Sequence, residues 1–324
     1  MSTLTFRGAV TAAIGDELRE DDRVLLFGED VAAAGGVFKA TDGLLEEFGP
    51  VRVRDAPISE VAIVGAAIGA AITGMRPVID LMFADFLAVC FDQVVNQAAK
   101  HRYLTGGQCS VPMTVRMANG AGGGFGAQHS QVVDSWLYGT HGLIVVAPSS
   151  PSSAYGLLRT AIQDPNPVVF LEHKMLYGMP EEITGELQPL PLGRAKIVLE
   201  GTDVTVVASQ VMLHRALEAA QALAAEGISA EVIDLCTVWP PDIETVTASV
   251  AKTNRLVVVE ECPAAAGWAA PLIMDVVERS FDELDAPPRR VSADPTPIPY
   301  APELERAWIP DAGQIAAAVR SVVG

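Results

Sequence analysis

Apolar and polar residues follow two alternating patterns along this chain: short uninterrupted apolar runs, and longer amphipathic stretches with helical spacing. In the first half, the apolar runs predict strands and the amphipathic stretches predict helices, with strands over 23–27, 51–54, 76–81, 111–117, 143–147 and 167–171, and helices over 6–19, 43–48, 60–73, 85–104 and 152–163. The pattern lapses in a proline-rich stretch and then restarts, with strands over 203–209, 228–235, 256–260 and 290–293, and helices over 213–225, 242–251, 270–281 and from 311 onward. Such alternation is typical of parallel α/β sheets. It predicts two parallel-sheet α/β domains, residues 1–178 and 195–324, joined by a linker over 179–194.

The helix that begins at Glu60 carries no charged side chain over its next thirteen residues. Ser59 is a suitable N-cap, and a carboxylate at Glu60 lies at the positive end of the helix dipole. A helix that is apolar on every face is expected to be buried, and Gly65 and Gly69 would let a second backbone approach closely. Glu60 is therefore either a favourable first-turn residue or an acid held at the mouth of a buried helix, where it could transfer protons.

Four side chains with useful chemistry follow predicted strands: Glu29, Glu60, Phe86 and His129. Ligands of open parallel sheets bind beyond the carboxyl ends of the strands, so we expect these side chains at one edge of one sheet. Each also has a plain structural interpretation. Phe86 has the helical spacing of a core residue, and His129 is either a surface-loop histidine or a general acid or base.

The glycine-rich loop over 122–127 matches the pattern G-x-G-x-x-A after a strand. A dinucleotide site also needs an acid about twenty residues further on, at the end of the next strand. Here that strand is followed by Pro148 and Ser149, so the match to a nicotinamide site is weak. The sequence lacks Gly-Lys-Ser/Thr and Gly-x-Ser-x-Gly, which argues against a P-loop and against a serine hydrolase of that type.

Composition narrows the class of protein further. The chain has 324 residues, 22 basic and 40 acidic, and a net charge of −18, which argues against nucleic acid as a partner. Its N-terminus lacks the regions of a signal peptide, and no apolar run is long enough to cross a bilayer, so we expect a cytoplasmic protein that binds no membrane. The four cysteines form no Cys-x-x-Cys pair and are expected to be reduced thiols: Cys90, Cys109, Cys236 and Cys262.

A series of motifs recurs in the order and register of one enzyme family. The motifs are Gly28-Glu-Asp-Val31, Gly35-Gly-Val-Phe38, Pro57-Ile-Ser-Glu60, Phe83-Ala-Asp-Phe86, Asp92-Gln-Val-Val-Asn-Gln-Ala-Ala-Lys100, Gln128-His-Ser-Gln131 and Asn166-Pro-Val168. Through them, nearly the whole chain resembles the beta subunit of the thiamine-diphosphate-dependent decarboxylase component of 2-oxo acid dehydrogenase complexes. Pyruvate, acetoin and branched-chain versions share this layout.

The resemblance implies a transketolase-like fold, in which a pyrimidine-binding domain precedes a transketolase C-terminal-like domain. It implies a heterotetramer of two alpha and two beta subunits with thiamine diphosphate at the alpha–beta interface. Mg²⁺ would be held by the alpha subunit through a Gly-Asp-Gly motif, which this chain lacks. The implied activity is the oxidative decarboxylation of a 2-oxo acid, followed by transfer of the acyl group to a lipoyl group on the acyltransferase core. The alternatives are an acetoin dehydrogenase beta subunit and a non-catalytic assembly subunit that docks the acyltransferase core.

The resemblance also implies roles for individual side chains. Glu60 would hydrogen-bond a ring nitrogen of the aminopyrimidine, and His129 would face the substrate or the lipoyl group as a proton donor. Phe86 would stack on the pyrimidine. The implied cofactor-binding residues are Glu29, Ile58, Glu60, Met82 and Phe86.

A loop that binds a structural potassium ion in relatives is matched by residues around an Asp-Pro-Asn-Pro sequence. Main-chain carbonyls and a side-chain oxygen suit such a hard cation, although the same sequence is also simply a good turn. The implied potassium ligands are Met113, Ala161, Ile162, Asp164 and Asn166.

Three departures from the family pattern leave the substrate and some subunit contacts open. Val89 stands where some pyruvate-type relatives carry glutamine, and Cys236 begins a variant of a more usual Arg-Thr-Leu-x-Pro. Glu260 and Glu261 replace a frequent His-Glu pair near the alpha–beta face.

Overall fold

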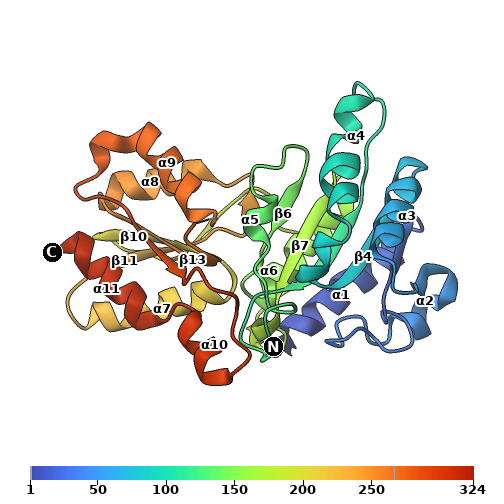
Figure 1. Cartoon of the computed structure of the whole chain (residues 1–324), viewed down its shortest axis with the longest axis horizontal. Coiled ribbons are helices and arrows are strands. Elements are labelled where there is room, and N and C mark those ends of the chain that lie inside the picture. The colour runs from blue at the N-terminus through green and yellow to red at the C-terminus, as the bar shows by residue number, and fades with distance from the viewer. Residues whose placement is uncertain (1, 266) are drawn as a thin grey trace. The chain divides into compact units, whose positions relative to one another are not determined.

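The computed structural model describes residues 2–265 and 267–324 (Figure 1), which divide into two compact units. The first unit comprises residues 2–119 and 139–192, and the second comprises Gly120–Tyr138 together with Gly193–Gly324. Residues 120–138, which the sequence analysis assigned to the first domain, thus pack with the second unit. Each unit contains a largely parallel sheet with helices packed on it, which confirms the predicted fold class.

The first unit is built on parallel strands in the order β6-β7-β5-β4-β2-β3. Its helices α1 and α6 pack against each other, and α3 packs on β4 and on η2. Its elements are β1 (Ser2–Thr5), α1 (Phe6–Glu20), β2 (Val24–Gly28), α2 (Leu44–Arg52), β3 (Val53–Asp55), α3 (Glu60–Ile72), β4 (Arg76–Phe83), η1 (Ala84–Ala88), η2 (Gln93–Ala98), α4 (Ala99–Leu104), β5 (Thr114–Asn119), β6 (Ile144–Val146), α6 (Pro151–Gln163), β7 (Val168–His173), η3 (Lys174–Leu176) and β8 (Pro180–Ile183).

Local sequence explains these boundaries. Every residue of β5 and of β7 is buried, as expected for central strands that are covered on both faces. The helix α6 begins with a capping box between Ser150 and Ser153, and Pro151 lies in its first turn, where a missing N–H costs nothing.

One expectation for this unit was wrong, and one stretch has a strand that the sequence pattern did not predict. The helix predicted over 85–104 is divided into the 3₁₀ helix η1, the π-helix η2 and the short helix α4. The stretch predicted as a linker contains β8, which pairs antiparallel with β1 at the start of the chain. Both polar strands lack the apolar run that signals a buried strand, so the sequence pattern did not reveal them.

The second unit has the strand order β14-β13-β10-β11-β9, in which only β9 is antiparallel to its neighbour. In Figure 1, α7 and α11 lie on one side of this sheet, and α8 and α9 lie on the other. Its elements are α5 (Asp134–Leu137), β9 (Lys196–Leu199), β10 (Val204–Ala208), α7 (Gln210–Ala224), β11 (Ala230–Asp234), β12 (Thr237–Trp239), α8 (Ile243–Thr253), β13 (Leu256–Pro263), α9 (Ala269–Ser280), η4 (Phe281–Glu283), β14 (Arg289–Ala293), α10 (Pro302–Trp308) and α11 (Ala312–Val323).

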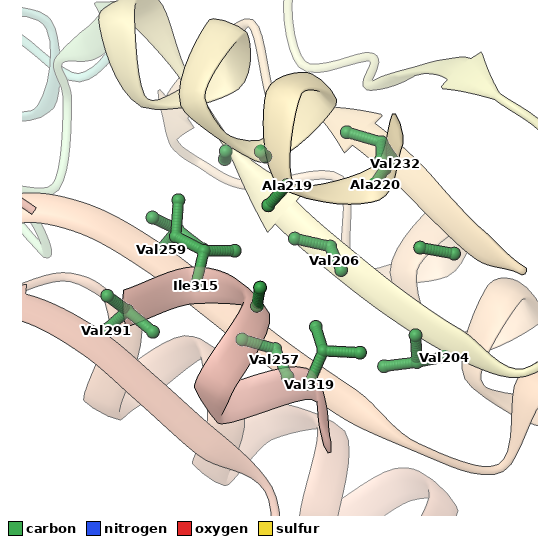
Figure 2. Packing of buried hydrophobic residues seen from close by; sticks show 14 of the residues in the cluster. Val204, Val206, Ala219, Ala220, Val232, Val257, Val259, Val291, Ile315 and Val319 are labelled. Carbon is green, nitrogen blue, oxygen red and sulfur yellow. The ribbon is translucent and has the colours of Figure 1, made fainter. Parts of the chain in front are cut away.

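The core of the second unit lies between its sheet and the pair α7 and α11 (Figure 2). Valines of β10 and β13 point toward Ala219 of α7 and toward Ile315 and Val319 of α11. β-Branched valines fit the pleated sheet surface, and small alanines let the helices approach it. In the described residues, no helix combines the length and the apolar character needed to span a membrane.

Candidate active site

The carboxyl ends of β2, β3 and β4 lie side by side in the first unit. Gly28, the last residue of β2, is in register with Asp55 of β3 and with Asp80 of β4. Glu29 follows β2 directly, and Glu60 opens α3 five residues after β3 ends. The sheet therefore brings together the acids that the sequence predicted at one edge.

Glu29 and Glu60 are both buried, with exposed fractions of 7% and 9%. Burial, and then the nearby charge of Glu60, raises the pKa of Glu29 above its usual value, while a hydrogen bond from the backbone of Ser59 lowers it. Among the described residues, Oε1 of Glu29 is buried and has no hydrogen-bond partner. An unsatisfied buried carboxylate oxygen is costly, so this atom is a natural acceptor for a polar ligand group.

The buried thiol of Cys90 also senses the charge of Glu60. Burial and the charge of Glu60 raise the pKa of Cys90 to about 12, so this thiol stays protonated and unreactive at neutral pH. Glu60 is therefore a buried acid that interacts electrostatically with a second buried acid, Glu29, and with the neutral thiol of Cys90. This environment suits a carboxyl group that exchanges a proton with a bound ligand.

Aromatic rings and a strained backbone form the next part of the site. Phe86 packs edge-to-face on Phe83 with ring centroids 5.8 Å apart, and Phe83 packs in the same way on Phe38 at 5.6 Å. Met82 has a positive φ of 67°, which is rare for a residue with a side chain. The side chain of Asp80 accepts a hydrogen bond from the amide of Met82 at 2.7 Å and so stabilises this turn of the backbone.

The helix α3 is not buried on every face, contrary to the prediction. Its inward face is buried through Ile63, Val64 and Ala67, but Val61 is 45% exposed and Ile72 is 38% exposed. A Cβ added at Gly65 or Gly69 would meet no atom within 4 Å in the described chain. The loop before the helix is similar, because Ile58 is 84% exposed. An uncharged surface therefore extends from the predicted cofactor site along α3.

His129 belongs to the second unit, whereas Glu60 belongs to the first. It lies in the glycine-rich loop after β5, half-buried, and its amide donates to the carbonyl of Gly126 at 3.3 Å. Two buried carboxylates, Glu261 and Glu305, accept hydrogen bonds from amides of this loop. Sequence analysis did not connect either acid with this loop: it noted Glu261 only as a departure from the family pattern, and it did not single out Glu305.

The same contacts argue against a nicotinamide site. The amides of Gly122 and Gly124 would have to face a pyrophosphate in a dinucleotide fold, but both donate to the carboxylate of Glu305. The loop therefore binds an anion of its own chain.

Four of the residues predicted to hold potassium lie where α6 leads into β7, and the fifth, Met113, directly precedes β5 and accepts a hydrogen bond from the amide of Val168 at 2.9 Å. Nη1 of Arg76 donates to the carbonyls of Ile162 and Asp164 at 3.0 and 3.2 Å. The side chain of Asp164 accepts from the amide and the side chain of Asn166. Hard oxygen donors thus converge here, and a carbonyl has a second lone pair, but a guanidinium already lies among them. Potassium binding stays a prediction.

Comparison with known proteins agrees with this geometry. Residues 2–180 match the transketolase pyrimidine binding domain, and residues 193–315 match the transketolase C-terminal domain. The chain is 46% identical over 321 residues to a protein of Oryza sativa subsp. japonica, pyruvate dehydrogenase E1 component subunit beta-2, mitochondrial, covering 98% of this chain and 85% of that one. The chain belongs to the family of E1 beta subunits of thiamine-dependent 2-oxo acid dehydrogenases. The family resemblance inferred from the sequence motifs is thus confirmed.

Other relatives include beta subunits of enzymes named for acetoin and for pyruvate. The chain is 45% identical over 330 residues to the beta subunit of acetoin:2,6-dichlorophenolindophenol oxidoreductase of Cupriavidus necator, covering 99% of this chain and 97% of that one. It is 44% identical over 319 residues to pyruvate dehydrogenase E1 component subunit beta of Rickettsia felis, with 98% of each chain covered. Among solved structures, a split-gene transketolase described as an inactive beta4 tetramer matches with a TM-score of 0.80 and 25% identity, covering 99% of this chain and 98% of that one. The transketolase-like fold is confirmed over both units of this E1 beta chain.

Proposed function

We propose that this chain supplies the pyrimidine-side half of a thiamine diphosphate site that it shares with an alpha subunit, and that the pair carries out the oxidative decarboxylation of a 2-oxo acid. The observation that carries the proposal is the pair of buried acids, Glu29 and Glu60, at adjoining carboxyl strand ends in a chain of the E1 beta family. The predicted roles of Ile58, Met82 and Phe86 in binding the cofactor are part of it.

The residues present fit an aminopyrimidine. Glu29 offers a buried oxygen without a partner, Phe86 offers an aromatic ring, and Ile58 offers an exposed apolar side chain that a ring could cover. When bound, thiamine diphosphate supplies the electron sink that decarboxylation of a 2-oxo acid requires. Glu60 would hold a proton against a ring nitrogen in a site from which apolar neighbours exclude water. His129 would donate a proton to the substrate or to the acyl-accepting lipoyl group of an acyltransferase core.

The alpha subunit is the partner that the exposed face of α3 would meet. The relatives are named as beta subunits, which implies an alpha subunit as partner. The run from Val61 to Thr73 contains no charge, yet its outer side is exposed, and Gly65 and Gly69 leave room for a second backbone. We propose that an alpha subunit covers this face in a heterotetramer of two alpha and two beta chains, and that it brings the Mg²⁺ site.

The experiment is to co-express the chain with a candidate alpha subunit that carries the Gly-Asp-Gly motif and to assay the purified pair. We expect release of carbon dioxide from a 2-oxo acid that depends on thiamine diphosphate and Mg²⁺, with reduction of a dye or a lipoyl domain. Neither chain alone should turn over. Turnover of acetoin without release of carbon dioxide would assign the acetoin reaction instead. Binding of an acyltransferase core without turnover of either substrate would support a non-catalytic assembly subunit and overturn the proposal.

Two further assignments belong to this proposal. All four cysteines of the described chain are free thiols, which supports the reducing cytoplasm as the site of action, although the plant relatives are named as mitochondrial proteins.

Potassium would bind at the loop that contains Asp164. Raising potassium chloride at constant ionic strength, with sodium chloride as the counterpart, should then raise the thermal unfolding midpoint, and equal midpoints would exclude the ion.

A further inference from the structure

Two buried carboxylates hold the backbone of the glycine-rich loop. Oε1 of Glu305 accepts from the amide of Gly122 at 2.8 Å, and its Oε2 accepts from the amide of Gly124 at 2.9 Å. Oε1 of Glu261, on β13, accepts from the amide of Ala121 at 2.6 Å. Three of the four amides from 121 to 124 are thus bound by charged acceptors, which form stronger hydrogen bonds than neutral ones.

The carboxylate of Glu305 is itself held firmly in place. Glu305 is 3% exposed and lies on the short helix α10, three residues before Trp308. Nε1 of Trp308 donates to the carbonyls of Asp294 and Thr296 at 3.0 and 3.2 Å. The ring of Trp308 also belongs to a small apolar cluster that includes Ala121 of the loop. The loop and its acceptor are therefore fixed to the same piece of core.

The loop depends on such external contacts. Gly120, Gly122, Gly124 and Gly126 all have positive φ, so the backbone runs through conformations that only glycine adopts easily. Glycines lose more conformational entropy on ordering than any other residue, and the loop has few side chains to pack. Without the carboxylate of Glu305, the amides of Gly122 and Gly124 would lose their acceptor and the loop would sample other conformations.

His129 is linked to this anchored segment. Its amide donates to the carbonyl of Gly126, and the amide of Gly120 donates to the carbonyl of Gln131 at 3.3 Å, which closes the loop at its base. The backbone of His129, from which the imidazole projects, is therefore tied to the backbone path from Gly122 to Gly126. We propose that Glu305 is a positioning residue for His129, and that it acts by fixing this path. The inference rests on the proposed function only for the catalytic use of His129.

The test compares Glu305→Gln with Glu303→Gln in the full chain. Gln at 305 keeps the size of the side chain but turns an NH₂ group toward one of the two amides. Glu303 lies on the same helix, is exposed, and forms an ion pair with Arg306 at 3.8 Å. Hydrogen–deuterium exchange of peptides over 119–131 should be faster by about 10- to 100-fold in Glu305→Gln and unchanged in Glu303→Gln.

Chemical modification reports on His129 itself. The rate at which diethylpyrocarbonate modifies His129, followed by mass spectrometry, should change in Glu305→Gln, remain as in the wild type in Glu303→Gln, and be partly restored in Glu305→Asp, which keeps the charge. Unchanged exchange in the loop, or faster exchange with an unchanged rate at His129, would overturn the inference. A thermal melt shows whether each variant is folded. If Glu305→Gln is globally unfolded, Glu305→Asp is compared with Glu303→Gln and the wild type instead.

Activity gives the last readout. In the assembled alpha–beta pair, Glu305→Gln should lower kcat about tenfold and leave the affinity for thiamine diphosphate unchanged. Normal kcat in a variant whose loop exchanges faster would also overturn the inference. Absence of thiamine-dependent turnover in the wild-type pair would instead overturn the proposed function, while the exchange and modification rates would still decide whether Glu305 positions His129.

Discussion

Asp80 and Arg116 meet at 3.1 Å between neighbouring parallel strands of the first unit, through Oδ2 and Nη1. Arg116 is only 1% exposed, and its other nitrogens donate to the buried Glu172 at 2.6 and 2.9 Å. Burial lowers the pKa of Arg116, but the charges of Glu172 and Asp80 more than compensate, so the guanidinium stays protonated. Because the other oxygen of Asp80 binds the amide of Met82, this ion cluster is joined directly to the predicted cofactor pocket.

Replacing Arg116 by methionine should lower the free energy of unfolding by about 3–5 kcal/mol. The reason is that the substitution leaves the carboxylate of Glu172 buried without its counter-charge. Urea denaturation followed by circular dichroism measures the loss. The matched control is Arg19→Met, since Arg19 pairs with Glu47 through a comparable two-point contact but is 50% exposed. That control should cost less than about 1 kcal/mol, and equal losses in the two variants would contradict the assigned role of burial.

Replacing Glu60 by glutamine should abolish turnover of the assembled pair. Glutamine preserves the size of the side chain but cannot exchange a proton, and general acid–base catalysis contributes about 10²- to 10⁴-fold. We expect kcat to fall by at least about 100-fold, with the heterotetramer intact on size-exclusion chromatography. Glu46→Gln, on the exposed surface of α2 in the same unit, should leave kcat unchanged. Wild-type activity in Glu60→Gln would refute its catalytic role.

Replacing Gly65 by leucine should block assembly with the alpha subunit without unfolding the chain. A Cβ added at Gly65 would meet no atom of the described residues within 4 Å, and leucine is a better helix former than glycine, so the isolated chain should gain up to about 1 kcal/mol of stability. Size-exclusion chromatography with the alpha subunit measures assembly. Gly185→Leu is the control, because Gly185 is also exposed and also has no neighbour within 4 Å. If Gly65→Leu assembled as well as the control, the alpha subunit would not lie on this face.

Glu260 should make the second unit less stable as the pH rises. It is 1% exposed, and burial raises its pKa to about 7 from an ordinary value of 4.5, against hydrogen bonds from the amide of Ala269 and the hydroxyl of Ser292. Between pH 4.5 and about 7 the folded chain keeps a proton that the unfolded chain releases, so the free energy of unfolding falls across this window by about 3 kcal/mol in total.

Urea denaturation at about pH 5 and about pH 8 measures this fall. The variant Glu260→Gln should lack it, because glutamine does not titrate. Glu278→Gln, at an exposed position of α9, should keep the wild-type dependence on pH. An unchanged pH dependence in Glu260→Gln would show that other groups are responsible.

The alternation of apolar runs and helical stretches was enough to predict two α/β units, because strands such as β5 and β7 are buried on both faces and read as unbroken apolar runs. The acids at the carboxyl strand ends followed from the same pattern. Composition could not show which face of α3 is buried within this chain. A face that a second subunit covers and a face that the chain's own core covers have the same apolar sequence, so Val61 and Ile72 looked like core residues although both are exposed.

The anchoring of the glycine-rich loop could not be predicted for a different reason. Glu261 and Glu305 lie 140 and 183 residues beyond the amides that they bind, and nothing near either acid in the sequence indicates that it contacts this loop. Their burial arises only when β13 and α10 are brought to the loop by the tertiary fold. The helix α10 has only seven residues, which is too few for the spacing of apolar residues to predict a helix.

Gly120–Tyr138 belongs to the second unit, although the residues before and after it belong to the first, and this limits how the gene can be divided into fragments. The polypeptide passes between the units after residues 119, 138 and 192, so no single cut in the proline-rich stretch separates two self-sufficient modules. A fragment that ends in this stretch would retain His129 but would lack Glu261 and Glu305, whose carboxylates bind the amides of the glycine-rich loop. Swapping C-terminal halves between homologous genes should therefore alter the chemistry assigned to the N-terminal half.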